Sequence, residues 1–256
     1  MFYFGIPLRA QESSRDWNKV CERFRATIHS ILRQTSPEFT VLVACHQIPD
    51  QGDPYDSRIH FLQADFSAPS LQAYPEHMVD KGRKVHLILS TIKRLGLGYF
   101  MAVDADDLVS RRIVEFVGQR QSVPGWLIRL GFEYQLGRDF IQLNPVINRH
   151  CGTTNIVQLQ SNDLPDDMKD MDVADVSKRY VMRRWHRTWP VGFAELGRRF
   201  RTLPFPGCIY VTGYSDNYTS NAPRGARTDR ISLRRAILAA SPRIALKAKI
   251  RDEFGL

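Results

Sequence analysis

Asp104-Ala105-Asp106-Asp107 places three carboxylates directly behind the apolar segment 99–103, which is typical of a buried strand. In open α/β sheets, ligands bind at the carboxyl ends of the strands, so these side chains are expected to point into a binding crevice. Clustered carboxylates repel one another, and a hard divalent cation is the usual way to hold them together. Mg²⁺ or Mn²⁺ bound by one or two carboxylates completes its shell with water and substrate phosphates. The cluster therefore predicts a phosphorylated substrate, and the alternative is that Asp107 caps a helix that begins near Ser110.

The segments that must position this cluster alternate between strand and helix. Strands are expected at 2–6, 39–45, 59–63 and 99–103, with helices before Pro37 and between Gly82 and Gly96. Ser13 or Ser14 is expected to cap the first helix, and residues 64–82 are expected to form a loop. This order predicts an α/β fold with a mostly parallel, Rossmann-type central sheet that is flanked by helices.

Beyond residue 110 the alternation is less regular, and the pattern predicts a smaller, mixed subregion. Its strands are expected at 126–136, 140–143, 155–159 and 208–211. Its helices are expected at 111–117, 176–185 and 192–200.

Length and composition exclude several classes of protein. The chain has 256 residues, 43% of them hydrophobic and 25% charged, as in an ordinary globular protein rather than a disordered one. No apolar run is long enough to span a bilayer, and the N-terminal residues lack the features of a signal peptide. The four cysteines are widely spaced, so we expect buried, reduced thiols in a cytoplasmic protein.

The net charge of +9 is concentrated at the C-terminus. Residues 224–256 carry nine basic and three acidic side chains, among apolar residues spaced as in an amphipathic helix. Such a basic tail fits a peripheral contact with an anionic membrane surface. The alternative is a helix that packs on the body and exposes its basic face to solvent.

Residues 1–110 resemble the nucleotide-sugar-binding half of a family 2, GT-A-type glycosyltransferase. The resemblance rests on the order and separation of four motifs: Ile6-Pro7, the segment 30–39 (SILRQTSPEF) before the strand Val41-Leu42-Val43, Lys81-Gly82-Arg83-Lys84, and Val103-Asp104-Ala105-Asp106-Asp107-Leu108. It implies a GT-A-like domain over residues 1–223, with a nucleotide-sugar-binding half at 1–110, an acceptor half at 111–223 and the tail at 224–256.

The resemblance also implies roles for the matching residues. Asp106 would coordinate a Mn²⁺ or Mg²⁺ ion that bridges the diphosphate, and Asp104 would contact the ribose or a metal-bound water and assist with the metal. Some GT-A enzymes supply a histidine as a further metal ligand, which here would be His186; the alternative is a histidine packed between Trp185 and Trp189. Those tryptophans would stack on an acceptor sugar or fill the core.

The remaining donor contacts follow from the same motifs. The nucleotide base pocket would be lined by Pro7, Leu8 and Arg9, and the base or diphosphate would be faced by Lys81 or Lys84. The family usually carries an acidic residue after the second strand, whereas this strand ends in Ala44-Cys45-His46-Gln47. His46 or Gln47 could hydrogen-bond a pyrimidine base instead. The segment 151–155 (CGTTN) resembles the small-residue turn that lies beside the donor sugar.

An inverting transfer needs a carboxylate to remove the proton of the acceptor hydroxyl. Asp166 and Asp167 lie in the acidic stretch 163–175, which is the region where the family usually places this base. The alternative for this stretch is a solvated acidic loop.

These features predict a metal-dependent hexosyltransferase that uses a nucleotide diphosphate sugar, with UDP as the expected carrier. The acceptor would be a glycan or lipid-linked molecule of polysaccharide biosynthesis at the cytoplasmic face of a bacterial membrane. A sugar nucleotidylyltransferase is the enzymatic alternative, but no glycine-rich phosphate loop follows the first strand. The other alternative is a protein without enzymatic activity that binds nucleic acid or an anionic surface. Nucleic acid is not the expected partner, because only the tail is strongly basic and no nucleic-acid motif occurs.

Overall fold

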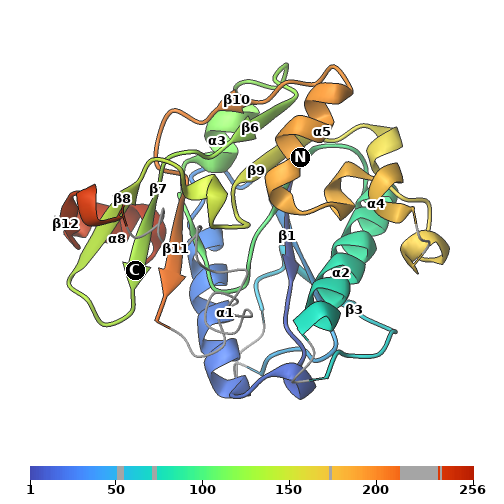
Figure 1. Cartoon of the computed structure of the whole chain (residues 1–256), viewed down its shortest axis with the longest axis horizontal. Coiled ribbons are helices and arrows are strands. Elements are labelled where there is room, and N and C mark those ends of the chain that lie inside the picture. The colour runs from blue at the N-terminus through green and yellow to red at the C-terminus, as the bar shows by residue number, and fades with distance from the viewer. Residues whose placement is uncertain (51–54, 71–73, 173–174, 214–235, 237) are drawn as a thin grey trace.

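The computed structural model describes residues 1–50, 55–70, 74–172, 175–213, 236 and 238–256. It contains two β-sheets (Figure 1). The central sheet has seven strands in the order β10-β6-β9-β4-β1-β2-β3. Their bounds are β1 Phe2–Pro7, β2 Phe39–Cys45, β3 Ile59–Gln63, β4 Tyr99–Ala102, β6 Gly125–Leu127, β9 Asn155–Gln158 and β10 Arg201–Thr202. Strands β3, β2, β1 and β4 are parallel, β9 is antiparallel to both β4 and β6, and β10 is parallel to β6.

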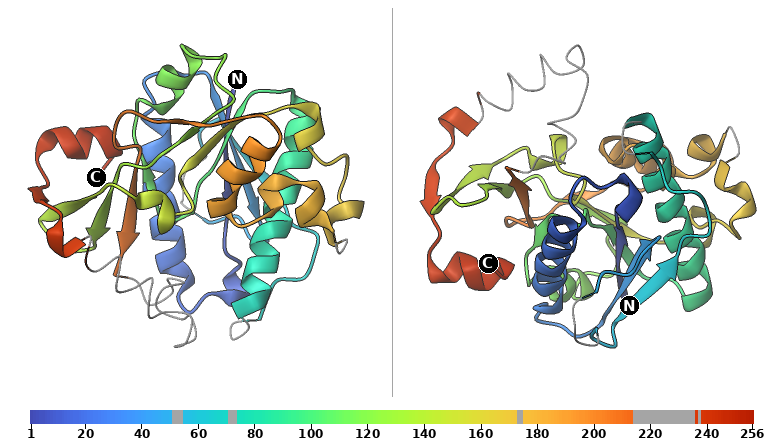
Figure 2. Two further views of the ribbon diagram at one scale, coloured as in Figure 1. Left: turned by 45° about the horizontal axis from the view of Figure 1, so that its top comes forward. Right: turned by 90° about the horizontal axis from the view of Figure 1, so that it is seen from below.

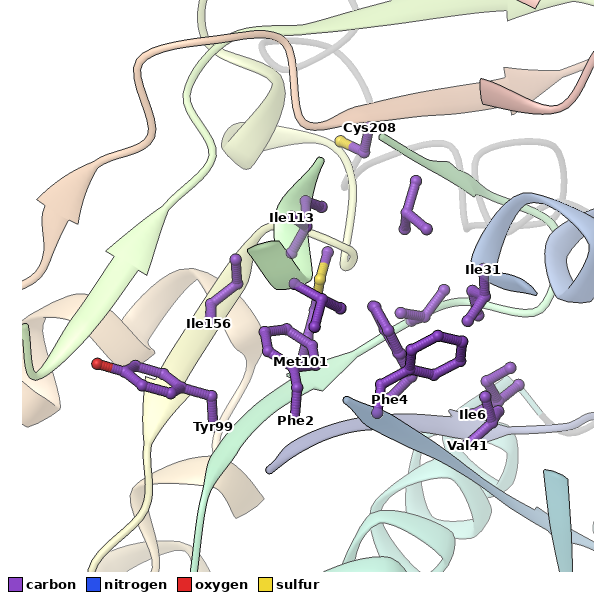
Figure 3. Close-up of a cluster of buried hydrophobic side chains, with 14 of the residues drawn as sticks. Phe2, Phe4, Ile6, Ile31, Val41, Tyr99, Met101, Ile113, Ile156 and Cys208 are labelled. Carbon is purple, nitrogen blue, oxygen red and sulfur yellow. The ribbon is translucent and has the colours of Figure 1, made fainter. Parts of the chain in front are cut away.

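Helices cover both faces of the central sheet, as the view from below shows (Figure 2). Helices α1 (Trp17–Leu32) and α3 (Ile113–Gly118) pack on one face, and α2 (Tyr74–Leu95) and α5 (Trp189–Glu195) on the other. Strand β1 alternates accordingly: Phe2, Phe4 and Ile6 enter the cluster on the α1 face, drawn in Figure 3, while Tyr3 packs on the α2 face. This two-sided burial explains why the strand is apolar throughout.

Two helices begin at positions that the sequence pattern does not predict. Helix α1 starts at Trp17, and the side chain of Asp16 caps it by accepting a hydrogen bond from the Lys19 N–H at 3.1 Å, in place of Ser13 or Ser14. Helix α2 starts at Tyr74, so the expected loop 64–82 is shorter than predicted. Pro75 is compatible with this start because the first turn of a helix has no intrahelical partner for its N–H groups.

The second sheet has five strands in the order β12-β8-β7-β11-β5. Their bounds are β5 Leu108–Val109, β7 Gly131–Gln135, β8 Phe140–Asn144, β11 Cys208–Thr212 and β12 Arg243–Ala245. Only β7 and β11 pair in parallel, so this smaller sheet is mixed, as predicted. The single strand expected at 126–136 is instead two strands, β6 in the central sheet and β7 in the second, because the chain crosses between the sheets at residues 128–130.

The segment between β9 and β10 is less helical than predicted. In place of one helix at 176–185, it forms α4 (Val176–Arg179) and a 3-10 turn at Val181–Arg183, followed by a second 3-10 turn at His186–Thr188. Helix α5 then spans Trp189–Glu195 rather than 192–200, with Pro190 in its first turn. Four further 3-10 turns lie at Gln11–Ser13, Ile147–Arg149, Ser161–Asp163 and Lys169–Asp172. All four cysteines are unpaired and buried, as expected.

The C-terminal residues belong to the folded body. Strand β12 pairs with β8, and both β12 and helix α8 (Ala248–Phe254) lie beside the second sheet (Figure 2). The side chain of Phe254 is buried and meets the ring of Phe132 edge to face. Ile244, Leu246 and Ile250, three of the apolar residues of the expected tail, pack on the same cluster. A boundary at residue 223 therefore does not separate residues 243–256 from the domain, while residues 224–235 of the expected tail lie outside the described residues. Among the described helices, none combines the length and hydropathy needed to cross a bilayer.

Candidate active site

The carboxylate cluster lies where the sequence pattern predicts, at the carboxyl end of β4 and next to the end of β1. The N–H of Val103 donates to the carbonyl of Gly5 at 2.9 Å and continues the pairing of the two strands up to the cluster. Residues 104–107 then form a turn that the N–H of Asp107 closes by donating to the carbonyl of Asp104 at 3.1 Å. The chain continues into β5 of the second sheet, so this turn joins the two sheets.

Asp107 is the buried member of the cluster. Its carboxylate is fully buried and its Oδ2 accepts hydrogen bonds from Thr153 Oγ1 at 2.6 Å and Cys151 Sγ at 3.0 Å. Burial, followed by repulsion from Asp106, raises the pKa of Asp107 well above its usual value. Asp107 does not cap helix α3, whose N-cap residue is Arg112 and carries no side-chain capping bond. Through these two hydrogen bonds, Asp107 links the turn to the segment 151–155.

Asp104 forms an ion pair with Lys81, which reaches the turn from helix α2. Burial acts to raise the pKa of Asp104, but the Lys81 ammonium outweighs it and holds the pKa below the usual value. Burial acts in the opposite direction on Lys81, and Asp104 outweighs it, so the pKa of Lys81 is raised. Both side chains are therefore charged, and the ion pair keeps each of them in place beside the carboxylate turn.

Asp106 is the third carboxylate of the cluster, and its pKa is also raised. Burial and the nearby charge of Asp104 raise its pKa to about 6, while Lys81, Arg23 and Arg9 act to lower it. Arg23 comes from the N-terminal half of α1, the part of that helix that lies at the carboxyl ends of the strands, and it is not among the site residues predicted from the sequence. A basic residue in the first turns of a helix that follows β1 is the signal that would have found it. Three cations thus act on the partly buried carboxylate of Asp106, and one of them, Lys81, also pairs with Asp104.

His186 lies beside this pair. Burial, followed by the charge of Lys81, lowers the pKa of His186 to about 4, although Asp104 acts to raise it. Its Nε2 atom is buried and has no hydrogen-bond partner among the described residues, and its backbone carbonyl accepts from Asn155 Nδ2 at 3.0 Å. The imidazole is therefore neutral near pH 7 and has an uncommitted ring nitrogen.

These residues fit a metal ion that shares its ligands with a substrate, not one held by protein alone. In the described ranges, no three His, Cys, Asp or Glu side chains are arranged to hold a metal ion, so Asp104, Asp106 and His186 do not form a three-residue metal site. Mg²⁺ and Mn²⁺ are commonly held by one or two carboxylates together with substrate phosphates. Asp106 and Asp104 meet that smaller requirement.

A metal at Asp106 predicts a specific dependence of nucleotide affinity on pH. Because the pKa of Asp106 is raised to about 6, a proton competes with the metal below that pH, and affinity for UDP with Mn²⁺ should fall roughly tenfold per pH unit. His186 has its pKa near 4 and stays neutral over most of this range. Calorimetric titrations between pH 7.5 and 5 measure the effect. The same decline should appear in His186→Gln, since a decline that disappears in this variant would assign the titration to the histidine instead.

Lys84 does not reach the face that Lys81 occupies. Its ammonium is fully buried and donates to the Leu8 carbonyl at 2.7 Å and to Asp80 Oδ2 at 2.8 Å. The Leu8 side chain is also fully buried in the core, whereas Pro7 and Arg9 on either side of it are partly exposed. Of the expected base-pocket residues, only Pro7 and Arg9 therefore have side-chain surface to offer a nucleotide.

His46 belongs to the same buried network. Its Nε2 lies 2.9 Å from the Phe66 carbonyl and 3.9 Å from Asp80 Oδ1, while its Nδ1 has no partner among the described residues. Burial, followed by the charge of Lys84, lowers the pKa of His46, so the ring is neutral. The network joins the carboxyl ends of β1, β2 and β3 to helix α2.

Asp166 and Asp167 do not lie beside the carboxylate turn. Asp166 is an exposed residue that pairs with Lys93, 12 positions after Lys81 on α2 and so roughly 18 Å away along the helix. Asp167 is about half exposed, and its backbone carbonyl lies 2.8 Å from the ring of His86. Asp166 and Asp167 thus lie in a solvated loop along α2, which is the alternative considered for the stretch, whereas Asp163 at its start is buried and pairs with Arg198 at 2.7 Å.

The two tryptophans have different environments. Trp189 is buried and its indole N–H donates to the Arg184 carbonyl at 2.9 Å, so it belongs to the core. Trp185 is 40% exposed, its ring meets the ring of His186 edge to face, and the guanidinium of Arg187 lies 4.9 Å from its centroid. Only Trp185 is available to a ligand at this site.

Comparison with known proteins gives a distant structural resemblance. No family model matches the chain, and no curated protein matches its sequence. A crystal structure of S. aureus TarS 1–349 superposes with a TM-score of 0.45 at 14% identity, over 82% of this chain and 60% of that one. A second S. aureus TarS structure gives a TM-score of 0.48 at 15% identity, over 82% of this chain and 36% of that one. The chain thus spans less than two thirds of either TarS chain.

Proposed function

We propose that this protein is a metal-dependent glycosyltransferase that moves a hexose from a nucleotide diphosphate sugar, with UDP as the expected carrier, to a glycan or lipid-linked acceptor. The observation that carries the proposal is the pair Asp104 and Asp106 at the carboxyl ends of β4 and β1, flanked by Lys81, Arg9 and Arg23. Carboxylates that hold a divalent cation, next to side chains that attract phosphate, are complementary to a metal-bound diphosphate.

The chemical demand of glycosyl transfer matches this arrangement. As the bond between the sugar and the diphosphate breaks, negative charge develops on the leaving nucleoside diphosphate. A bound Mn²⁺ or Mg²⁺ would neutralise part of that charge. Lys81, Arg9 and Arg23 hold the diphosphate, and the ion pair with Asp104 keeps the Lys81 ammonium in place before the substrate arrives. Preorganised charges of this kind stabilise a transition state without a cost of reorganisation.

The acceptor side of the proposal rests on Trp185. Its indole is 40% exposed beside His186, with the guanidinium of Arg187 4.9 Å from its centroid, and sugar rings stack on indole surfaces of this kind. An acceptor ring bound there would lie on the His186 side of the proposed donor site.

Release of the nucleoside diphosphate from nucleotide sugars tests the proposal without knowledge of the acceptor. UDP-, GDP-, CDP- and ADP-hexoses are incubated with the protein and Mn²⁺, or with EDTA, and the nucleotides are quantified by chromatography. We expect slow release from one nucleotide class, lost with EDTA. Release no faster than in the Asp106→Asn protein for every sugar nucleotide would count against a transferase.

A further inference from the structure

We propose that Thr153 is a positioning residue of this site, one that sets the shape of the carboxylate turn through a single hydroxyl group. The inference rests on the proposed function, because it assigns Thr153 a role in binding the nucleoside diphosphate. Thr153 lies in the segment 151–155 and is fully buried, so it cannot contact a ligand itself. Its effect passes through Asp104 and Asp107.

The hydroxyl of Thr153 holds both ends of the turn at once. Its oxygen accepts a hydrogen bond from the backbone N–H of Asp104 at 3.0 Å, and its proton is donated to Asp107 Oδ2 at 2.6 Å. A hydroxyl has one proton and two acceptor lone pairs, so these two bonds have compatible directions. Asp106, between the two tethered residues, thereby takes a defined place in the turn.

The neighbours of Thr153 hold the same turn. Cys151 Sγ also contacts Asp107 Oδ2 at 3.0 Å, and the N–H of Thr153 points to that sulfur at 3.3 Å. The backbone of Gly152 hydrogen-bonds to Asp104. A Cβ atom at Gly152 would stand 2.5 Å from Asp104 Oδ2, so only glycine lets the segment approach the carboxylate this closely.

The other end of the segment reaches His186. Asn155 is buried and its Nδ2 donates to the His186 carbonyl at 3.0 Å. Asn155 is also the first residue of β9 and pairs with Leu127 of β6, which anchors it in the central sheet. The segment 151–155 therefore ties Asp104 and Asp107 on one side and His186 on the other to one rigid element, and Thr153 is its contact with the turn.

The test compares Thr153→Val, which keeps the shape and removes both hydrogen bonds, with Thr153→Ser, which keeps the hydroxyl. Thr27→Val is the matched control, because Thr27 is an equally buried threonine on α1 whose hydroxyl has no partner among the described residues. Two quantities are measured for each protein: the affinity for UDP in the presence of Mn²⁺, and amide hydrogen exchange of peptides that cover residues 104–107.

We expect Thr153→Val to remain folded, to lose at least tenfold in affinity, and to exchange faster at residues 104–107 alone. Thr153→Ser and Thr27→Val should stay within about threefold of the parent. If the parent binds the nucleotide and Thr153→Val binds it equally well, the positioning role is refuted and the proposed function stands. If the parent binds no nucleoside diphosphate, the proposed function is refuted and the role of Thr153 with it. An equal loss of affinity in Thr27→Val would show that any buried Thr→Val change has this effect, and would also overturn the role.

Discussion

Replacing Asp106 with Asn is expected to abolish metal-dependent nucleotide binding while leaving the protein folded and more stable. Binding should weaken at least 100-fold, which corresponds to about 2.7 kcal/mol, because the carboxylate proposed to hold the metal becomes a neutral amide. Titration calorimetry with UDP and Mn²⁺ measures this loss. The matched control is Asp166→Asn, which changes an exposed loop carboxylate that pairs with Lys93 near the C-terminal end of α2 and should leave affinity within about twofold.

The gain in stability follows from the pKa of Asp106. Its value in the folded protein is raised from 3.8 to about 6, so the unfolded chain ionises first and the ionised form costs the folded state free energy. Stability therefore falls as pH rises from about 4 to about 6, and above pH 6 the cost is on the order of 2 to 3 kcal/mol. Asp106→Asn removes this cost at pH 7.5 and should show no advantage near pH 4. Urea unfolding at both pH values measures it, and an Asn variant less stable than the parent at pH 7.5 would contradict the assignment.

Replacing Lys84 with Met is expected to cause a large loss of stability. The ammonium is fully buried between Asp80 and the Leu8 carbonyl, and its loss leaves a buried carboxylate and a carbonyl without partners. Breaking a buried ion pair on one side costs about 3 to 5 kcal/mol. Chemical unfolding measures the change in the free energy of unfolding.

Two further variants test whether the loss of stability comes from the unpaired buried charge. The double variant Asp80→Asn with Lys84→Met removes both charges and should recover part of the loss, because no unpaired charge is then left in the interior. Lys93→Met breaks an exposed pair with Asp166 and should cost less than about 1 kcal/mol. A Lys84→Met protein as stable as the parent, with nucleotide affinity selectively lost, would restore Lys84 as a direct ligand of the nucleotide.

The elements that the sequence predicts best include the strands that are buried over most of their length. The strands at 2–7 and 39–45 are apolar runs bounded by turn residues, and the structure places them within one residue of expectation. The strand at 59–63 lies at the edge of the sheet and is only partly buried, and its bounds are also as expected. The first part of α2 could not be predicted this way. Its early turns have few apolar positions, and Gly82 lies inside the helix with the guanidinium of Arg183 packed over it. Long-range packing of this kind has no local signal.

The residues of the candidate site also divide into those that a local motif predicts and those whose place depends on long-range packing. The place of Asp104 and Asp106 is predictable because a carboxylate motif after a strand has a fixed place in an α/β sheet. Lys81 is implied only by the resemblance to the glycosyltransferase motifs, with Lys84 as the other candidate. Lys81 and Lys84 belong to one motif and one helix, and only the position of Leu8 and Asp80 decides which ammonium is buried. Asp166 is predicted only from its position along the chain. That position does not show how far from the carboxylate turn the loop beside α2 lies.

The most direct test of the account is a calorimetric titration of UDP, GDP, CDP and ADP into the protein with Mn²⁺ and again with EDTA. A ligand that contacts the Asp104–Asp106 pair through a metal must lose its affinity when the metal is removed. We predict that one nucleoside diphosphate binds with Mn²⁺ and that the same titration with EDTA, or with Asp106→Asn, gives no heat of binding. Binding of equal strength with and without the metal, or no binding of any nucleoside diphosphate, would contradict the account.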